Sequence, residues 1–387
     1  MNLPLKYNIR NLFVRWRSTF TTVIGIALVV AVYVLMQALA AGLEAASKNT
    51  GFPLNVLVLR KGSTAESSSQ ITPEQFRVVK YLPQIEKDVL NMPMVSAEVV
   101  VLINLPRLNK SGEANVLVRG IGPNGFKLRP QVKLSAGRWF DPGKREVVVS
   151  KKLAGRFANF GIGQSFITAG TRLVVVGWLE GEDSVYDSEI WMDTDEARSI
   201  FDRENYSSVL IRVKEDAALK DLISRIESDK RLPLRAVREK EFYAAQTRTA
   251  IPIKILGNFL ATSMSIGAVF AAMNTMYANV GSRIREIGTL RVLGYRRRTI
   301  VLSFMIEGVF LALIGGVVGC LIAVPMHGFS TGTVSFDTFS EVVFHFRLTP
   351  IIIFKGMLFA IAVGAVGSIL PAFRAGGVPV INALNAV

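Results

Sequence analysis

Hydrophobic residues are concentrated in four long runs, and the rest of the chain is mixed. The first two runs contain no charged residue, and the third and fourth contain one each. Each run exceeds the roughly 20 residues that an α-helix needs to cross about 30 Å of hydrocarbon. The pattern therefore predicts four transmembrane helices, at residues 18–43, 255–282, 299–324 and 351–373.

Between the first two runs, residues 44–254 show a different pattern. Short β-branched segments alternate with Gly, Pro and Asp, which is typical of strands separated by turns. Thr72, Pro73 and Gln75 supply an N-cap, a first-turn proline and a capping-box partner for a helix to about Val89. Apolar residues at helical spacing predict a second helix over 217–229. We expect an inserted α+β domain with strands near 54–59, 97–104, 114–119, 146–149, 172–178, 189–192 and 208–213.

Positive charge predicts the orientation. Residues 1–17 contain Lys6, Arg10 and further arginines but no acid, and residues 283–298 contain six arginines against Glu286 alone. Because cytoplasmic segments are enriched in Lys and Arg, both stretches are expected in the cytoplasm. The large domain and a short loop at 325–350 then lie outside, and the tail at 374–387 lies inside. This topology is that of a multi-pass membrane protein with both termini in the cytoplasm.

Two alternatives concern the start of the chain. Residues 5–16 place Leu5, Ile9 and Leu12 on one helical face, which predicts a cytoplasmic interfacial helix within residues 1–17 rather than a plain charged flank. Residues 38–40 resemble a signal-peptide cleavage site. A signal core spans only about 7–15 residues, however, and this run is longer, so a retained anchor is favoured.

Composition agrees with a membrane protein. Half of the residues are hydrophobic and the mean hydropathy is +0.37. Residues 44–254 carry 32 basic and 26 acidic residues, so they account for +6 of the net charge of +15. The remaining charge belongs mainly to the expected cytoplasmic segments and predicts no nucleic-acid partner. The single cysteine, Cys320, falls in the third run, so the inserted domain contains no disulfide.

No motif predicts catalysis or a bound cofactor. Residues 120–125 match G-x-G-x-x-G by letter, but Pro123 and the residues after it do not open a helix. Residues 137–144 have the wrong spacing for a phosphate loop. Only His327 and His345 are present, both in the short loop, which excludes a Ser-His-Asp triad or a His-rich metal site in the large domain. A membrane-anchored enzyme is therefore disfavoured.

Four residues within the third run have structural significance. Glu307 is an acid within a predicted span, and such a group is normally paired or functional. A pair with an arginine of the 283–298 loop is favoured over a proton relay. Gly315, Gly316 and Gly319 predict a face for close helix packing.

Several motifs together resemble the MacB/FtsX-like ABC transporter permeases. R-E-I-G-T-L-R-V-L-G at 285–294, followed by Glu307 and the glycine pair, is similar to their most specific signature. The opening helix at 10–27, G-R-W-F-D at 137–141 and I-W-M-D at 190–193 are also similar, as is the closing segment at 370–384. The similarity covers nearly the whole chain in the family's order. One departure is Ser282, where many members have Glu.

The resemblance implies a four-helix permease of the bacterial inner (cytoplasmic) membrane with an inserted periplasmic core domain of the MacB type. ATP and Mg²⁺ would be bound by a separate cytoplasmic ABC ATPase subunit, because no nucleotide site is visible in this sequence. A homodimer or a pair with a paralogous permease, a periplasmic adaptor and membrane lipids are the further partners it implies. The implied role is export, or extraction from the outer face of the membrane. The alternative is an FtsX-like transducer that transports nothing and regulates a cell-wall hydrolase.

The loop at 283–298 is the predicted coupling segment. Ile284, Ile287, Leu290 and Leu293 form one stripe of a helix that a groove in the ATPase could hold. The alternative is an orientation signal with an amphipathic surface. The residues that the resemblance assigns to coupling are Arg283, Arg285, Glu286, Ile287, Leu290, Arg291, Leu293 and Gly294.

Overall fold

A computed structural model describes residues 16–108, 112–246, 250–334 and 339–379. The chain divides into two compact units. The helical unit comprises Met1–Ala41, Pro252–Phe329 and Phe346–Val387, and the α/β unit comprises Gly42–Ile251 and Ser330–His345. The predicted interfacial helix at 5–16 lies outside the described residues except for its last position, and so do residues 380–387 of the tail.

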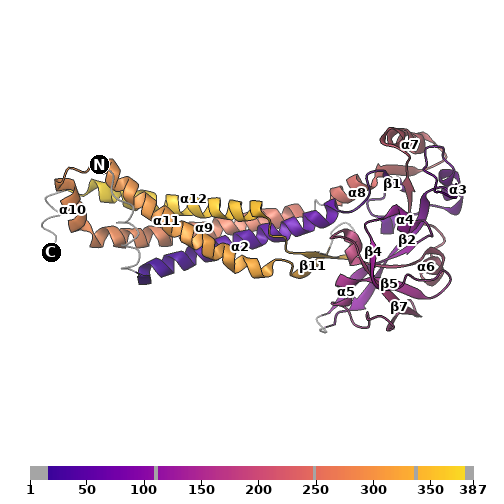
Figure 1. The fold of residues 1–387 in the computed structure, drawn as a ribbon. Helices are drawn as coiled ribbons and strands as arrows, with labels where there is room; N and C mark the ends of the chain where they lie inside the picture. Colours follow the sequence, from indigo (N-terminus) through magenta and orange to yellow (C-terminus); the bar gives the residue numbers. More distant parts are fainter. Residues whose placement is uncertain (1–15, 109–111, 247–249, 335–338, 380–387) are drawn as a thin grey trace. The chain divides into compact units, whose positions relative to one another are not determined.

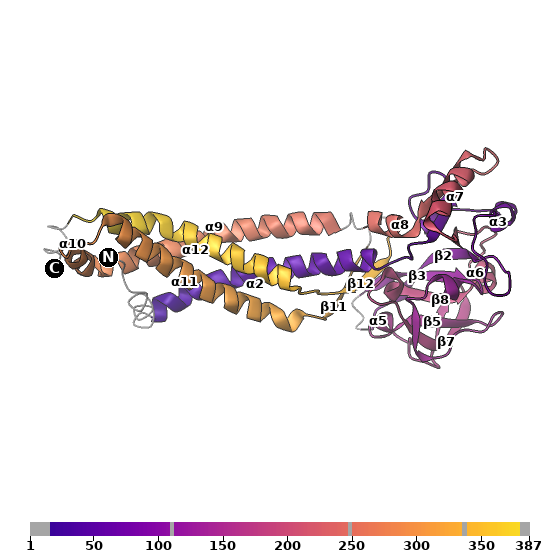
Figure 2. The same ribbon diagram turned by 45° about the horizontal axis from the view of Figure 1, so that its top comes forward.

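The helical unit contains the four predicted spans. Within the described ranges, four helices are long and apolar enough to cross a membrane. They run side by side in both views (Figures 1 and 2). Two shorter helices, α10 (Ile284–Val292) and η4 (Val324–Met326), follow α9 and α11. The long helices are α2 (Trp16–Lys48), α9 (Ala250–Ser282), α11 (Arg297–Ala323) and α12 (Pro350–Gly377).

Glycines allow α11 to approach its neighbours closely. A Cβ atom at Gly319 would lie 2.5 Å from the carbonyl oxygen of Ala27 in α2. One at Gly315 would lie 3.0 Å from Ile26, also in α2, while one at Gly316 would lie 2.8 Å from Ala360 in α12. The three glycines therefore serve two different helix contacts. Any larger side chain would push the helices apart.

The α/β unit is built on a ten-stranded sheet. Its strand order is β10-β1-β9-β2-β3-β8-β5-β7-β4, with β6 paired to β7, and all pairs are antiparallel except β3–β8 and β5–β7. Strand β2 joins the two halves because Val95–Glu98 pair with β9 and the residues from Val99 onward pair with β3. The strands are β1 (Asn55–Arg60), β2 (Val95–Pro106), β3 (Glu113–Ile121), β4 (Lys133–Gly137), β5 (Glu146–Ser150), β6 (Ser165–Thr168), β7 (Thr171–Glu180), β8 (Glu189–Asp193), β9 (Ser208–Arg212) and β10 (Leu234–Arg238).

Helices cover both halves of the sheet. All seven predicted strands and the helix expected at 217–229 are confirmed. The helix expected from Thr72 forms with its capping box but ends at Lys80, not near Val89, because Pro83 disfavours helix in the residue before it. The helices are α3 (Pro73–Lys80), α4 (Gly125–Leu128), α5 (Lys151–Ala154), α6 (Thr194–Ile200), α7 (Asp216–Ser228) and α8 (Glu239–Gln246), with the 3₁₀ turns η1 (Glu66–Ser68) and η2 (Val185–Ser188).

The loop between the third and fourth spans belongs to the α/β unit. It forms a hairpin of β11 (Ser330–Val334) and β12 (Glu341–His345), whereas the sequence indicated only a short outer loop. Val343 is buried in the same apolar cluster as residues of β2, β3, β5 and β7. The amide of Val343 donates to the Ser188 hydroxyl at 2.8 Å. The hairpin is thus an integral part of the α/β core.

Candidate functional site

The predicted coupling segment is a helix joined directly to two long helices. Helix α9 ends at Ser282 and α10 begins at Ile284, so Arg283 is the only residue between them. At the other end, Gly294 adopts a left-handed φ of +91°. The amides of Gly294 and Tyr295 donate to the carbonyls of Arg291 and Leu290, which is the Schellman arrangement that closes a helix. The direction of α10 is therefore fixed at both ends.

The structure pairs Glu307 with Arg283. Nη1 of Arg283 lies 2.9 Å from a carboxylate oxygen of Glu307, and both side chains are almost fully buried. Nε of Arg283 also lies 3.1 Å from the Glu286 carboxylate, and its guanidinium lies 5.0 Å from the Phe304 ring centroid. A buried carboxylate in a membrane helix is costly without such a partner. The pair attaches the start of α10 to α11.

The predicted docking stripe on α10 is divided between the bundle and the surface. Ile287 is 2% exposed and packs with Phe304 and other core residues of the helical unit. Leu290 and Arg291 are half-buried, whereas Arg285 and Leu293 are exposed. Ile287 is therefore not available to a partner, which corrects that part of the predicted surface. The exposed residues of the segment include Arg285, Glu286, Val292 and Leu293.

Two arginines hold the β11–β12 hairpin through one carboxylate. Glu341 is 1% exposed and forms ion pairs with Arg107 at 2.7 Å and with Arg156. The two arginines come from the end of β2 and the turn after α5. The sequence reasoning missed this cluster because its members are separated by up to 234 positions. A buried charge with two partners strongly resists displacement of the hairpin.

A larger network of buried charges lies at the centre of the α/β unit. Arg119 forms bidentate contacts of 2.8–3.0 Å with Glu189 and with Glu66, and a further contact of 2.8 Å with Glu98. Arg129 is also fully buried and contacts Glu98 through both terminal nitrogens. These residues come from η1, β2, β3, β8 and the segment after α4. The network therefore ties distant parts of the sheet together.

The electrostatics of this network keep its members in defined protonation states. Burial raises the pKa of the Glu66 carboxyl, but the charge of Arg119 and hydrogen bonds from Arg119 and Ser208 lower it more, to about 2. Burial raises the pKa of both Tyr186 and Tyr243 well above the usual value. Both phenols thus remain neutral donors, and Tyr243 donates to Glu66 at 3.1 Å.

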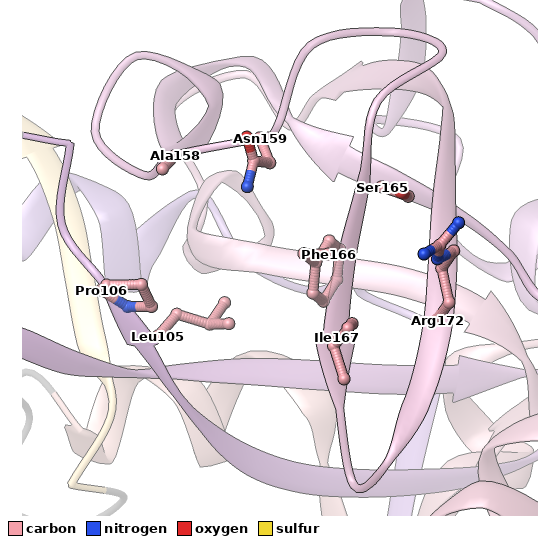
Figure 3. Close-up of a pocket in the computed structure, with 8 residues that line it drawn as sticks. All are labelled: Leu105, Pro106, Ala158, Asn159, Ser165, Phe166, Ile167 and Arg172. Carbon is pink, nitrogen blue, oxygen red and sulfur yellow. The ribbon is translucent and has the colours of Figure 1, made fainter.

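One surface cavity of the α/β unit is large enough to hold a side chain of a bound protein or a small ligand. Its volume is about 290 Å³, and Leu105, Phe166 and Ile167 form its apolar part. Figure 3 shows the Arg172 guanidinium beside Ser165, and in this view the Asn159 amide lies on the other side of the Phe166 ring. These three polar groups can position a ligand, but they include no acid–base pair or nucleophile–base pair for catalysis.

The described side chains offer no metal site, and the small cavity beside Arg119 is too small for an organic cofactor. Over the described ranges, no group of three or more His, Cys, Asp or Glu residues could hold a metal ion. The cavity beside Arg119 and Glu189 has a volume of about 30 Å³, which suits a water molecule and not an organic cofactor.

Comparisons with known proteins decide the family. Residues 19–229, more than half of the chain, match the MacB-like periplasmic core domain family, and residues 258–380 match the FtsX-like permease C-terminal family. The chain belongs to the MacB/FtsX-like ABC transporter permease family. This MacB/FtsX-like permease is a membrane-embedded protein with four apolar helices and a periplasmic core domain inserted between the first and second.

Individual relatives cover different shares of the sequence. The macrolide export ATP-binding/permease protein MacB of Hahella chejuensis is 25% identical over 76% of this chain and 46% of its own length. The uncharacterized ABC transporter permease YknZ of Bacillus subtilis is 25% identical over 70% of each chain. The crystal structure of the periplasmic region of MacB from Actinobacillus actinomycetemcomitans matches 51% of this chain and 94% of its own, at 15% identity and a TM-score of 0.38. This MacB/FtsX-like permease spans less than half of the MacB relatives that it matches.

Proposed function

We propose that this chain is the permease subunit of a mechanotransmission-type ABC transporter. A separate cytoplasmic ATPase subunit would bind α10, and ATP hydrolysis there would move the periplasmic domain so that a substrate is exported or extracted at the outer face of the inner membrane. Two copies of the permease, or this chain with a paralogue, would form the membrane part. The cavity at Phe166 is then a candidate contact for a periplasmic adaptor or for the substrate.

The observation that carries this proposal is the attachment of α10. One residue separates α10 from α9, and four separate it from α11. The buried Arg283–Glu307 pair then holds α10 against the bundle. Because helices transmit a displacement that a flexible linker would absorb, a force on α10 reaches both long helices.

The connections between the long helices and the α/β unit support transmission of a displacement from α10 to that unit. Helix α2 is continuous from Trp16 to Lys48, and its last residues from Gly42 belong to the α/β unit. The hairpin between α11 and α12 is held in that unit by Glu341. A periplasmic core domain of this size favours transport over the FtsX-like regulatory alternative.

Charge reversal on α10 tests the proposal. We expect Arg285→Glu with Leu293→Asp to weaken ATPase binding by about tenfold or more, since both side chains are exposed and interface anchors carry this much binding energy. The complex would be purified from native membranes, with bound ATPase and ATP turnover measured. The matched control is Arg225→Glu with Leu90→Asp, which makes equivalent changes at exposed positions of the α/β unit away from that cavity. Normal ATPase binding by the α10 variant would refute the proposal.

A further inference from the structure

A groove between the start of α11 and the end of α12 combines an apolar wall with two arginines. Its volume is about 540 Å³, within the range of roughly 300–1,000 Å³ that small-molecule sites occupy. Leu302 and Phe373 line it and are 59% and 63% exposed. Arg297 and Arg298 line the same groove. They belong to the arginine-rich stretch at 283–298 but are not among the residues assigned to coupling.

Within the described part of the chain, the two guanidinium groups have no carboxylate partner. Among the residues that the structure describes, neither Arg297 nor Arg298 forms an ion pair or a side-chain hydrogen bond. Arg283, near the start of the same arginine-rich stretch, differs because it forms an ion pair with Glu307. Both side chains are exposed at the start of α11, and arginines at the end of a membrane helix extend towards the lipid headgroups, whose phosphates attract them.

The shape of the groove follows from the close approach of the two helices. A Cβ atom at Gly376 would lie 2.7 Å from Val301 and 3.2 Å from the carbonyl oxygen of Arg297. Glycine therefore lets α12 touch α11 at this level, while Leu302 and Phe373 project as the walls. The result is a concave surface that apolar side chains line together with Arg297 and Arg298.

We propose that this groove binds one anionic phospholipid. The phosphate would accept hydrogen bonds from Arg297 and Arg298, because guanidinium groups recognise phosphate through paired N–H donors. An acyl chain would lie along Leu302, Met305 and Phe373. Charge complementarity and the position on two membrane helices favour a phospholipid over a soluble anion. The proposal goes beyond the coupling function and requires no bound ATPase.

Lipid retention by the full chain tests the proposal. The purified chain, stripped of lipid in detergent, would be exposed to vesicles of phosphatidylglycerol or phosphatidylcholine, and retained lipid measured by native mass spectrometry. We expect selective retention of phosphatidylglycerol and an about thirtyfold loss of affinity in Arg297→Gln/Arg298→Gln, since each basic residue near an anionic lipid contributes to binding. Arg347→Gln/Lys355→Gln removes two exposed cations elsewhere on the helical unit and should leave retention unchanged.

A second variant separates lipid from free phosphate. Phe373→Ala removes an exposed apolar wall, so it should reduce phosphatidylglycerol retention without unfolding the bundle. Equal retention of both lipids, or unchanged retention in the double arginine variant, would overturn the proposal. Displacement of the lipid by inorganic phosphate alone would assign the groove to a soluble anion instead. Loss of ATPase binding without any change in lipid retention would assign it to the ATPase contact.

Discussion

The two units of the molecule bury charge in opposite ways. The helical unit packs its long helices through glycines and places its buried pair, Arg283 and Glu307, where α10 meets α11. The α/β unit instead places a many-membered network around Arg119 and Arg129 at its centre. A central network resists deformation throughout, whereas a terminal pair controls one joint. Under the proposed function, the α10–α11 joint would move and the α/β domain would follow as a rigid body.

The largest expected effect comes from removing Arg119, the central cation of the network in the α/β unit. Arg119→Gln leaves Glu66 and Glu189 without their main partner and removes one contact from Glu98, so we expect a loss of about 3–5 kcal/mol in the free energy of unfolding. Chemical denaturation of the full chain in detergent measures it. Arg138→Gln is the control, because Arg138 is half exposed and its pair with Glu146 is worth at most about 1 kcal/mol. Equal losses in the two variants would show that the network is not the centre of stability.

Acid titration tests the same network without a change of charge on arginine. The folded-state pKa of Glu66 is lowered from 4.5 to about 2. The ionised carboxylate therefore contributes fully to the free energy of unfolding above pH 4.5, and this contribution disappears as the pH falls towards 2. The full contribution corresponds to about 3 kcal/mol. Tryptophan fluorescence during denaturation at several pH values between about 5 and 2 follows the loss. Glu66→Gln should make the free energy of unfolding depend less on pH in this range. An unchanged acid transition in that variant would assign the transition to other carboxyl groups.

The joint of the helical unit is tested by neutralising its acid. Glu307→Gln removes the 2.9 Å ion pair but leaves Glu286 near Arg283, so we expect a loss of about 1.5–3 kcal/mol. ATPase binding should persist while its coupling to transport fails, because α10 is less firmly attached. Thermal unfolding and ATP turnover measure the two effects. Glu286→Gln, which changes a half-exposed carboxylate, should cost less than about 1 kcal/mol; a larger loss than that of Glu307→Gln would contradict the assignment.

The smallest expected effect concerns the glycine contacts. Gly319→Ala brings a methyl group within 2.5 Å of the Ala27 carbonyl oxygen and should destabilise the bundle by about 1–3 kcal/mol. Gly267→Ala places the same methyl group where no atom lies within 4 Å and should cause no loss. Thermal unfolding of the two variants in one detergent compares them directly. A neutral Gly319→Ala variant would show that this helix contact adjusts easily.

The sequence predicted the features that depend on local pattern. Long apolar runs identified the four long helices, and β-branched segments identified seven strands, because burial requires such residues wherever the chain enters lipid or a sheet. The Thr72 capping box was also correct, since capping uses neighbours in sequence. Sequence order alone suggested that Glu307 would meet a loop arginine, but not that Arg283 would be the one.

The features that were missed depend on distant partners. The hairpin strands are five residues each, and their burial becomes evident only when Glu341 meets Arg107 and Arg156. The stripe on α10 was recognised, but periodicity does not say whether a partner or the protein's own core covers Ile287. The network around Arg119 has no local signature because its carboxylates come from three separate segments.

The most direct test of the account is a distance measured at the end of α2. A spin label at Lys48→Cys, in a Cys320→Ser background, reports the separation between the two subunits of the assembled transporter, and Lys48 is exposed enough to accept it. Pulsed electron paramagnetic resonance would compare nucleotide-free and ATP-trapped complexes. The account predicts that the distance changes with nucleotide, and that Glu307→Gln reduces the change although ATPase stays bound. An identical distance in both states, in a complex that still transports, would contradict transmission through the helices.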